Sequence, residues 1–364
     1  MAAPTVAVVG LGFGRAHIPA FQSNGCEVIA VCQRNQAAAE AVAKRYNVPQ
    51  VFERWEQMLG RARPDIVVIA TPPASHRAIA VEALAEGAHV LCEKPLAMDV
   101  EEARDMVDVA ARSHRVAMTS FNWRYIPAMQ RLRAMVEADH LGRPFHMSGR
   151  WLGARFADEA ATATWRMDRS EAGHGAMGDA GVHLIDLVRW TFGEFTRVAA
   201  HAGIAHPSRT VPGGERAADT EDFCTVLGEL ASGAHVTLEL SRAAIGRNDH
   251  GLDAYGSSGA LSYRVDRAKP KWWRGELDAA AADGGLTPVK VRSSVPRSAT
   301  HGDPLEVIGK TTIAPLVKDF LTAIRKGASA SPSFHDGLRA QAVLDAILAS
   351  QASGTWIDVS SAGL

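Results

Sequence analysis

The chain has 364 residues, of which 47% are hydrophobic, and its 39 basic residues nearly balance its 40 acidic ones. This length favours two domains over one and is ample for sizeable cores. Without a basic run or stripe, the sequence offers no electrostatic footprint for nucleic acid or for a membrane surface. The longest apolar stretches, near 5–13 and 66–70, are too short to span a bilayer, so we expect no membrane partner.

The cysteines and histidines show no metal-binding spacing. Cys26, Cys32, Cys92 and Cys224 are scattered without a CxxC pair, and the 14 histidines contain no HExxH pattern. We therefore predict buried free thiols and no metal. The N-terminus enters an apolar run without the pattern of a secretory signal, so we expect a cytoplasmic protein.

The first 120 residues alternate short β-branched runs with helical stretches. Strands are predicted at 6–9, 28–32, 65–70, 89–92 and 116–119, and helices at 15–23, 36–46, 76–86 and 100–113. The run DIVVIA at 65–70 is almost continuously apolar, as expected of a central parallel strand. The alternation predicts an α/β domain in which helices cover both faces of a doubly wound parallel sheet.

After residue 121 the pattern changes. Helices are predicted at 127–138, 179–191, 315–326 and 337–350, and strands such as 224–230 and 235–240 are separated by Gly and Ser turns, which favours antiparallel pairing. The Ala/Gly/Asp-rich segment 277–286 is expected to be a mobile loop. We predict a dinucleotide-binding domain over 1–122 and an α+β domain for substrate binding and oligomerisation over 123–364.

A glycine-rich turn joins the first strand to the first helix and contains Gly10, Gly12, Phe13 and Gly14. Glycines allow the chain to turn sharply, and they bring backbone N–H groups and the positive end of the helix against a pyrophosphate. The alternative is a merely structural turn. The usual GxGxxG pattern would place the third glycine at position 15, so this loop is predicted to be one residue tighter.

The end of the second strand determines the choice of cofactor. An NAD-preferring site would place Asp or Glu here to hold the ribose 2′-hydroxyl, but the sequence has Gln33 and Arg34. Arg34 could pair with a 2′-phosphate, which favours NADP. Alternatively, Arg34 is a solvated charge that stacks on adenine, and Gln33 bonds the ribose. Both NAD and NADP remain open as cofactors.

The fourth predicted strand ends in Cys-Glu-Lys-Pro at 92–95. Ligands of open parallel sheets bind at the carboxyl ends of the strands, where Lys94 is expected to lie. A lysine whose pKa is lowered by burial suits proton transfer to an alcohol oxygen. The alternative is a strand-end lysine that points into water.

A second informative stretch runs from 173 to 186 and contains Asp179 and His183. On a helix these residues lie on one face with Cβ atoms about 6 Å apart, and Asp186 continues that face. An Asp–His pair can orient a hydroxyl and share its proton. The alternative is an N-capping aspartate followed by an ordinary helical histidine.

Together these motifs resemble the glucose–fructose oxidoreductase, inositol dehydrogenase and rhizopine-catabolism (Gfo/Idh/MocA) family. The landmarks are GLGFG (10–14), ATPPASH (70–76), CEKPLA (92–97), FNWRY (121–125), TWR (164–166), GDAGVHLID (178–186) and SFHDGLRAQAVLDAILAS (333–350). The resemblance implies a Rossmann domain and a C-terminal domain with an open, predominantly antiparallel sheet. It also implies a homodimer or homotetramer, because such sheets often bury one face between subunits.

The resemblance implies that Lys94 is the catalytic lysine and that Asp179 and His183 orient the substrate and transfer its proton. The residues expected to contact the cofactor are Gly10, Gly12, Phe13, Gly14, Gln33, Arg34, Thr71, Pro72, Pro73, His76, Glu93, Lys94, Asn122, Trp165 and Arg166. The residues expected to contact the substrate are Lys94, Arg124, Tyr125, Arg166, Asp179 and His183.

The predicted reaction is hydride transfer between NAD or NADP and a hydroxyl or ketone of a sugar, a sugar derivative or a cyclic polyol. Lys94 and His183 are expected to transfer protons, and which of them is the main acceptor stays open. Trp123, Trp151, Trp165, Trp272 and Trp273 are candidates for an aromatic wall or for core packing. Two other functions stay open: an NAD-dependent redox-neutral glycosidase and a non-catalytic sugar or dinucleotide sensor.

Overall fold

The computed structural model describes residues 2–211, 214–293, 295, 297–300 and 302–359. The chain forms two compact units, one of Met1–Tyr125 with Ser294–Leu338 and the other of Ile126–Ser293 with Arg339–Leu364. The boundary predicted after residue 122 lies three residues before this division. The predicted second domain also included residues 294–338, which the structure places in the first unit.

A six-stranded parallel sheet in the order β3-β2-β1-β4-β5-β6 forms the first unit and confirms the predicted doubly wound fold. Its strands are β1 (Thr5–Val9), β2 (Glu27–Cys32), β3 (Gln50–Phe52), β4 (Ile66–Ile69), β5 (His89–Cys92) and β6 (Ala117–Thr119). Sequence reasoning missed β3 and the following helix, α3 (Trp55–Ala62), because a three-residue strand shows no period.

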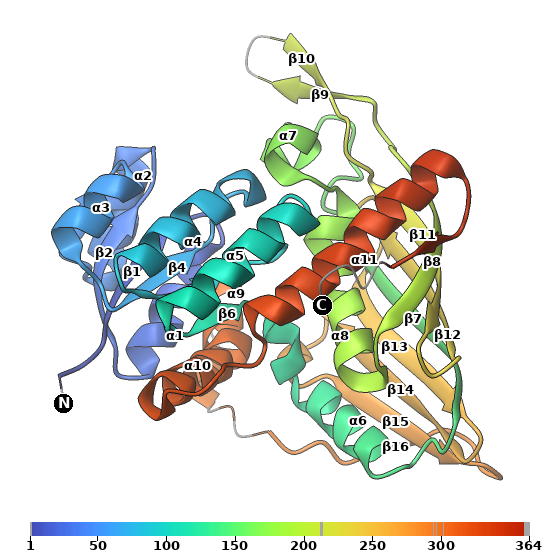
Figure 1. Ribbon diagram of the computed structural model, residues 1–364. Coiled ribbons are helices and arrows are strands. Elements are labelled where there is room, and N and C mark those ends of the chain that lie inside the picture. The colour runs from blue at the N-terminus through green and yellow to red at the C-terminus, as the bar shows by residue number, and fades with distance from the viewer. Residues whose placement is uncertain (1, 212–213, 294, 296, 301, 360–364) are drawn as a thin grey trace. The chain divides into compact units, whose positions relative to one another are not determined.

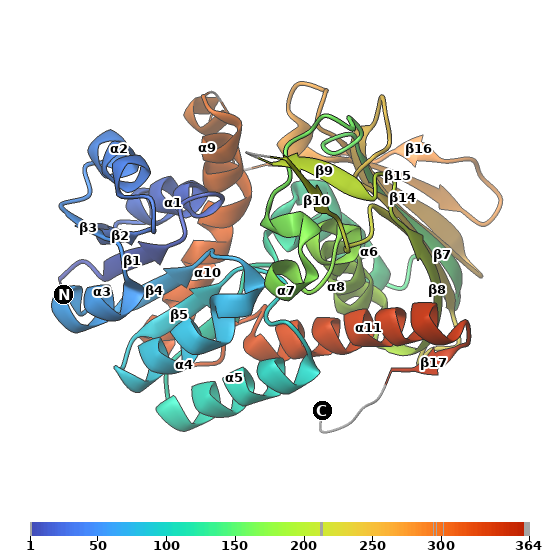
Figure 2. The same ribbon diagram turned by 90° about the horizontal axis from the view of Figure 1, so that it is seen from above.

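Helices cover both faces of this sheet (Figure 2). The side chains of Val6 and Val8 pack on one face with α1 (His17–Ser23), α2 (Gln36–Tyr46) and α10 (Ala314–Lys326). Ala7 and Val9 point to the other face, which is covered by α3, α4 (His76–Ala85) and α5 (Val100–Ser113). Because successive strand residues alternate between two buried faces, the strands read as continuous apolar runs.

The segment 302–338 belongs to the first unit because it packs on α1. Phe320 of α10 is fully buried in the same core as Phe21 of α1. Between α9 (Pro304–Ile308) and α10 lies the wide turn Gly309–Ile313, where a Cβ on Gly309 would lie 2.2 Å from the Ala16 carbonyl oxygen. Only glycine permits this approach, so a short local sequence feature determines a contact across almost 300 residues of chain.

A nine-stranded sheet in the order β16-β15-β14-β13-β7-β12-β11-β8-β17 forms the second unit. All neighbouring pairs are antiparallel except β7 with β12, which confirms the predominantly antiparallel sheet. Its strands are β7 (Pro144–Gly153), β8 (Phe195–Gly203), β11 (Phe223–Leu230), β12 (His235–Ser241), β13 (Asn248–Gly256), β14 (Gly259–Asp266), β15 (Glu276–Ala281), β16 (Thr287–Pro288) and β17 (Ile357–Asp358). A separate hairpin comprises β9 (Ser208–Val211) and β10 (Gly214–Ala217).

The mobile loop predicted at 277–286 is wrong for its first half, because residues up to Ala281 form β15. Leu277 pairs with Tyr263 of β14 and is 2% exposed. Ala279 and Ala280 are also buried, whereas Ala281 is exposed. The small side chains of these alanines gave the segment the composition of a loop.

Three helices lie on one face of the large sheet: α6 (Pro127–Glu137), α8 (Val182–Phe192) and α11 (Phe334–Ser353) (Figure 1). The helix α7 (Arg169–Ala172) is a single short turn. The other face of the sheet is open, since Phe223 and Leu227 of β11 are exposed while Cys224 and Val226 between them are buried.

Among the described residues, no helix has the length and hydropathy needed to cross a membrane. In the same part of the chain, no three His, Cys, Asp or Glu side chains come together as metal ligands. The four cysteines are buried and unpaired, as predicted, and burial raises the pKa of the Cys26 thiol to about 11.

Candidate active site

The three glycines of the turn after β1 have three different surroundings. Gly10 has a φ of +84°, and a Cβ there would lie 2.6 Å from the Ala70 carbonyl. A Cβ on Gly12 would meet no atom within 4 Å, whereas one on Gly14 would lie 3.1 Å from the Cβ of Ala70. A sharp turn, an open approach for a ligand and close helix packing are the three requirements of a dinucleotide-binding turn.

The early third glycine is accommodated by a tighter start of the first helix. A 3₁₀ turn over Gly14–Ala16 precedes α1, and the Ala16 N–H donates to the Phe13 carbonyl at 2.9 Å. A 3₁₀ turn has fewer residues per turn than an α-helix. The turn therefore keeps its form although the glycine comes one residue early.

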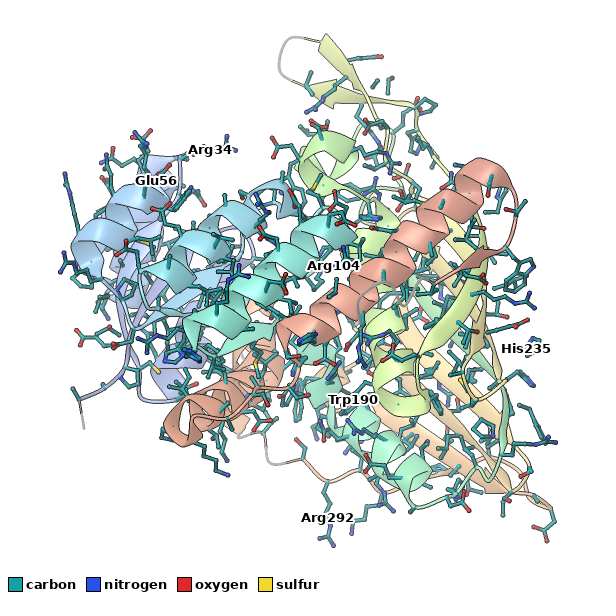
Figure 3. All side chains as sticks on the ribbon, viewed as in Figure 1. Arg34, Glu56, Arg104, Trp190, His235 and Arg292 are labelled. Carbon is teal, nitrogen blue, oxygen red and sulfur yellow. The ribbon has the colours of Figure 1, made fainter. Side chains whose placement is uncertain are left out.

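The end of β2 anchors this turn. The side-chain oxygen of Gln33 accepts a hydrogen bond from the Leu11 N–H at 3.0 Å. Arg34 is exposed and points away from the ribbon (Figure 3), and it has no hydrogen-bond or ion-pair partner in the described part of the chain. Gln33 thus has a structural role at the turn, and contact of either residue with a ribose stays a prediction.

The residue before Lys94 belongs to a buried polar pair. An oxygen of Glu93 lies 2.8 Å from Nε2 of His17, and the two side chains are 8% and 0% exposed. Burial raises the pKa of Glu93, but the hydrogen bond to His17 and the charges of His17 and Lys94 outweigh it and lower the pKa overall. Half-buried Lys94 therefore follows directly on a buried carboxylate at the end of β5. Sequence reasoning missed His17, although its place in the first turn of α1 was a usable signal.

His76 joins the chain after β4 to the chain after Lys94. Its Nδ1 lies 3.0 Å from the Pro95 carbonyl oxygen and its Nε2 lies 2.9 Å from that of Thr71. The ring is fully buried, and this burial lowers its pKa. His76 therefore links the segment after β4 to the segment after β5. Thr71 and Pro72 are half-buried, and Pro73 is buried.

Three predicted contact residues bond to one later segment of the first unit. Asn122 donates to Thr312 at 2.8 Å, Arg124 to Asp336 at 2.9 Å and Tyr125 to Asp319 at 2.9 Å. Arg124 is only 2% exposed. These bonds hold the segment 312–336 to the chain that follows β6. The predicted contacts of the three residues with cofactor or substrate stay predictions.

In the second unit, the helix that carries Asp179 begins earlier than predicted. A π-helical turn over Met177–Gly181 leads into α8, and the Asp179 N–H donates to the Gly175 carbonyl at 2.9 Å. Asp179 is therefore not an N-cap, and the alternative based on capping is wrong. The regular α-helix predicted from 179 is also wrong, because the wider turn of a π-helix separates Asp179 from His183.

Glu221, which is distant in sequence, binds the start of this helix. One of its carboxylate oxygens accepts the N–H groups of Gly175 at 2.7 Å and of Met177 at 3.0 Å. Glu221 is 2% exposed, and a Cβ on Gly175 would lie 2.0 Å from its carbonyl oxygen. Glycine at position 175 thus allows the backbone of Glu221 to approach the start of this helix closely.

Both the side chain and the backbone carbonyl of Arg166 have partners within the second unit. Its Nε lies 3.4 Å from a carboxylate oxygen of Asp179, and its guanidinium lies 4.3 Å from the ring centre of Trp165. Its carbonyl oxygen accepts hydrogen bonds from Thr220 at 2.8 Å and Arg242 at 3.1 Å. Two predicted site residues, Arg166 and Asp179, are therefore brought together.

The ring of His183 packs against a stack of buried rings on the large sheet. It lies 5.4 Å from Trp151, with 19° between the planes, and Trp151 lies 4.1 Å from His250. His250 Nε2 in turn lies 2.9 Å from the Tyr263 hydroxyl. Burial lowers the pKa of His250 and raises that of Tyr263, so both are neutral around pH 7. Trp151 therefore packs against a predicted site residue, and Trp123 and Trp273 are also buried.

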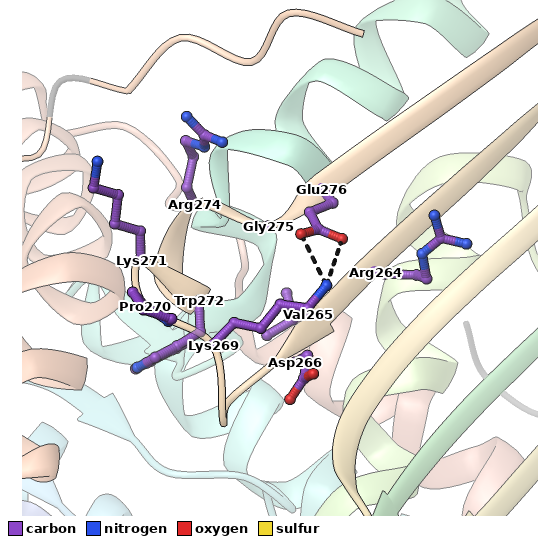
Figure 4. Close-up of a pocket in the computed structure, with 10 residues that line it drawn as sticks. All are labelled: Arg264, Val265, Asp266, Lys269, Pro270, Lys271, Trp272, Arg274, Gly275 and Glu276. Carbon is purple, nitrogen blue, oxygen red and sulfur yellow. Dashed lines mark hydrogen bonds and ion pairs between the residues drawn. The ribbon is translucent and has the colours of Figure 1, made fainter. Parts of the chain in front are cut away.

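The end of β14 and the start of β15 line a pocket (Figure 4). Within it, Lys269 Nζ lies 3.2 Å from a carboxylate oxygen of Glu276. Of the tryptophans considered for a sugar wall, Trp272 lies in this lining. No residue predicted to contact cofactor or substrate does, so we leave this pocket outside the candidate site.

Two family models match the chain. One describes an oxidoreductase family with an NAD-binding Rossmann fold and matches residues 5–121. The other describes the GFO/IDH/MocA C-terminal domain and matches residues 129–262. The chain therefore belongs to the Gfo/Idh/MocA family of oxidoreductases, which confirms the predicted family, fold class and nicotinamide dinucleotide cofactor.

The similarity to known proteins covers almost the whole chain. Levoglucosan dehydrogenase of Pseudarthrobacter phenanthrenivorans is 32% identical over 90% of this chain and 88% of its own length. Inositol 2-dehydrogenase of Rhizobium meliloti is 26% identical over 97% of this chain and 98% of its own length. A solved structure of levoglucosan dehydrogenase with NADH and L-sorbose has a TM-score of 0.88 and 30% identity, and covers 99% of this chain and 100% of its own.

Proposed function

We propose that the protein transfers a hydride between NAD or NADP and a hydroxyl or ketone of a sugar, a sugar derivative or a cyclic polyol. The observation that carries this proposal is the glycine turn, because Gly12 faces open space where a pyrophosphate would approach. Lys94 stands at the end of a strand of the same sheet. The named activities of the similar dehydrogenases, on levoglucosan and inositol, support a sugar or polyol as substrate.

The residues of the first unit fit a dinucleotide. Gly10, Gly12 and Gly14 would hold its pyrophosphate at the N-terminal end of the first helix. The bound nicotinamide supplies the hydride acceptor in oxidation and the hydride donor in reduction.

The chain itself must handle the proton. Oxidation of a secondary alcohol breaks one C–H and one O–H bond, and the proton of the hydroxyl needs a base. We assign Lys94 and His183 to this proton transfer. Asp179 would orient the substrate by accepting a hydrogen bond from a hydroxyl, and the bond from Arg166 holds its carboxylate in place.

We also propose a homodimer or homotetramer that buries the open face of the large sheet. Leu227 is 48% exposed and Phe223 is 42% exposed on this face. An exposed apolar sheet face is typical of an interaction surface. Light scattering should give a mass of two or four chains, and Leu227→Arg should lower it, whereas an unchanged monomer mass for the wild type would refute the proposal.

The function is tested by following the absorbance of reduced nicotinamide. Wild type and Lys94→Ala receive NAD or NADP with inositols, aldoses, anhydrosugars and glycosides. We expect turnover of one class, reduced about 10²–10⁴-fold in Lys94→Ala with cofactor binding retained. Lys269→Ala, a lysine paired with Glu276 outside the candidate site, is the matched control.

Two results would contradict the proposal. Glycoside cleavage without a net change in absorbance would indicate the redox-neutral glycosidase. Binding of cofactor without any turnover would indicate a sensor.

A further inference from the structure

The imidazole of His183 packs on a series of buried rings, and we call Trp151, His250 and Tyr263 the ring column. The His183 ring lies 5.4 Å from Trp151, centre to centre, with 19° between the planes. Trp151 lies 4.1 Å from His250 at 9°, and His250 lies 5.6 Å from Tyr263. All four residues are at most 8% exposed. The ring column therefore links His183, on α8, to three strands of the large sheet.

The register of the large sheet brings the three rings of the column together. Trp151 of β7 and His250 of β13 lie directly opposite each other in an antiparallel pair. Tyr263 of β14 lies opposite Leu252, which is two residues along β13 from His250. Side chains of opposite residues share a face of the sheet, and diagonal neighbours are within reach of aromatic rings. The strand pairing therefore places all three rings on one face.

A hydrogen bond anchors the far end of the ring column. Nε2 of His250 lies 2.9 Å from the Tyr263 hydroxyl, and both side chains are fully buried. Burial lowers the pKa of His250 and raises that of Tyr263, so this bond joins two neutral groups around pH 7. Breaking a buried hydrogen bond leaves polar atoms without partners, which is unfavourable. Trp151 therefore packs against a ring whose orientation is fixed.

His183 does not determine its own ring plane. The torsion that turns an imidazole about its Cβ–Cγ bond has a broad, roughly two-fold preference, so neighbouring atoms decide the orientation of the ring. A general base must bring its nitrogen to about 2.6–3.2 Å from the proton-bearing oxygen. A displacement of about 1 Å can lower the rate about 10²-fold. Rotation of the His183 ring gives up its stacked contact with Trp151, so the stack favours one ring plane.

We infer that Trp151 is a positioning residue that holds the His183 imidazole in the plane from which it takes or returns the proton of the substrate hydroxyl. His250 and Tyr263 hold Trp151 in turn. An indole is a hydrogen-bond donor only, so Trp151 is not itself the base, and its effect on the rate passes through His183. This inference rests on the proposed function for the reaction, but the orientation of the His183 ring can be measured without turnover.

The kinetic test compares Trp151→Leu, which removes the ring, with Trp151→Phe, which keeps one, in the intact protein with its cofactor. We expect Trp151→Leu to lower kcat about 10–100-fold for the substrate that the wild type converts. KM and the cofactor dissociation constant should stay within about threefold. Trp151→Phe should recover kcat to within about fivefold of the wild type. The solvent deuterium isotope effect on kcat should rise in Trp151→Leu, because proton transfer then limits the rate.

The orientation of the ring is measured by NMR of protein labelled at the histidine rings, with His183→Asn to assign the signal. An aromatic ring shields a ring stacked on it, so the His183 signal should move downfield in Trp151→Leu and less so in Trp151→Phe. Phe195→Leu is the matched control, because Phe195 is a buried ring at the start of β8 in the same sheet. It should leave kcat, the isotope effect and the His183 signal unchanged.

Tyr263→Phe provides a milder test that keeps every ring and removes only the hydroxyl that anchors His250. It should lower kcat about 2–5-fold, again with KM unchanged. If Trp151→Leu does not fold, wild-type kcat in both Tyr263→Phe and Trp151→Phe overturns the inference.

The remaining outcomes separate the inference from the proposed function. If Trp151→Leu lowers kcat no more than Phe195→Leu does, or leaves the His183 signal in place, the inference is overturned and the proposed function stands. A loss confined to KM would assign Trp151 to substrate binding and also overturns the inference. If the wild type converts no substrate, the proposed dehydrogenase is rejected, whereas a downfield His183 signal in Trp151→Leu would still uphold the positioning of the ring.

Discussion

The glycine turn of the first unit and the Asp179 helix of the second unit are both held in position, but by different kinds of interaction. At the turn, the positions of backbone atoms are determined by Gly10, Gly12 and Gly14 within five residues of sequence. At the helix, Glu221 binds the N-terminus from 44 and 46 residues away. The first arrangement can be read from local sequence, whereas the second requires knowledge of the tertiary fold.

The two regions also differ in the exposure of their carboxylates. The side chain of Glu93 in the first unit is 8% exposed, lies 2.8 Å from Nε2 of His17 and accepts a hydrogen bond from the Lys94 N–H at 3.3 Å. In the second unit, the side chain of Asp179 is 29% exposed and lies 3.4 Å from Nε of Arg166. A buried carboxylate is occupied by partners within the chain, whereas an exposed one can also accept a hydrogen bond from a ligand.

The largest expected effect is that of Gly10→Ala. Its Cβ would lie 2.6 Å from the Ala70 carbonyl, and its φ of +84° disfavours alanine. Strain and overpacking together should lower the free energy of unfolding by about 2–6 kcal/mol. Urea denaturation measures this change.

Gly12→Ala is the matched control, because its Cβ meets no atom of the described chain within 4 Å. It should change the free energy of unfolding by less than about 0.5 kcal/mol and yet weaken dinucleotide binding. Equal loss of stability in the two variants would show that the two glycines do not have separate roles.

The next effect is that of Glu221→Ala, which leaves the N–H groups of Gly175 and Met177 buried without their acceptor. The loss should be about 2–4 kcal/mol in unfolding free energy. Sugar turnover should fall while the cofactor dissociation constant stays within about twofold, because Glu221 lies in the unit without the glycine turn. Thermal denaturation, steady-state kinetics and cofactor titration measure the three quantities.

Glu221→Gln keeps one acceptor oxygen and should recover more than half of the loss. If alanine and glutamine were equally damaging, the charge of Glu221 and not its two hydrogen bonds would support the helix. If cofactor binding fell as far as sugar turnover, the distinction between the two regions would fail.

Sequence reasoning succeeded where local pattern determines structure. The strands of the parallel sheet are buried on both faces and read as apolar runs, and glycines mark the turn after β1. It failed for β3, which is three residues long, and for β15, whose alanines resemble a loop. Short or small-residue strands are recognised by their neighbours in a sheet, which a single sequence does not show.

The site shows the same limit. Asp179, His183 and Arg166 were identified by motif, and the structure joins Arg166 to Asp179. Glu221 and His17, which support the predicted residues, were missed. Each of the two acts through a partner at least 44 residues away, so no local spacing marks it.

A smaller effect concerns pH and buried His174 of the second unit. Burial, together with the charge of Arg169, lowers its pKa from 6.5 to about 3. Below pH 6.5 the unfolded chain takes up a proton that the folded chain refuses until about pH 3, so stability falls as pH falls through this window. The limiting slope is about 1.4 kcal/mol per pH unit.

His174→Asn should remove this contribution, so its loss of stability between pH 6 and 4 should be about 2 kcal/mol smaller than that of the wild type. Denaturation midpoints at several pH values measure the slope. His235→Asn, on the exposed face of β12 (Figure 3), should follow the wild type. Parallel curves for His174→Asn and wild type would show that His174 does not hold its neutral form.

The smallest effect is that of Arg34→Ala, and it bears on the choice of cofactor. Arg34 is exposed and has no partner within the described chain, so its removal should not change stability. Because Gln33 is already bonded to the turn, Arg34 is the side chain at this strand end that is available for a 2′-phosphate. We expect Arg34→Ala to weaken NADP about tenfold and to leave NAD unchanged, as measured by fluorescence titration of both cofactors.

The exposed Arg112 on α5 provides the control, since Arg112→Ala should change neither dissociation constant. Equal weakening of NAD and NADP by Arg34→Ala would point to stacking on adenine, which both cofactors share. Unchanged binding of both would remove Arg34 from the cofactor site. The turn held by Gln33 and the three glycines would then bind the dinucleotide through backbone groups alone. The second unit differs, because there the side chain of Glu221 binds the start of the helix that carries Asp179.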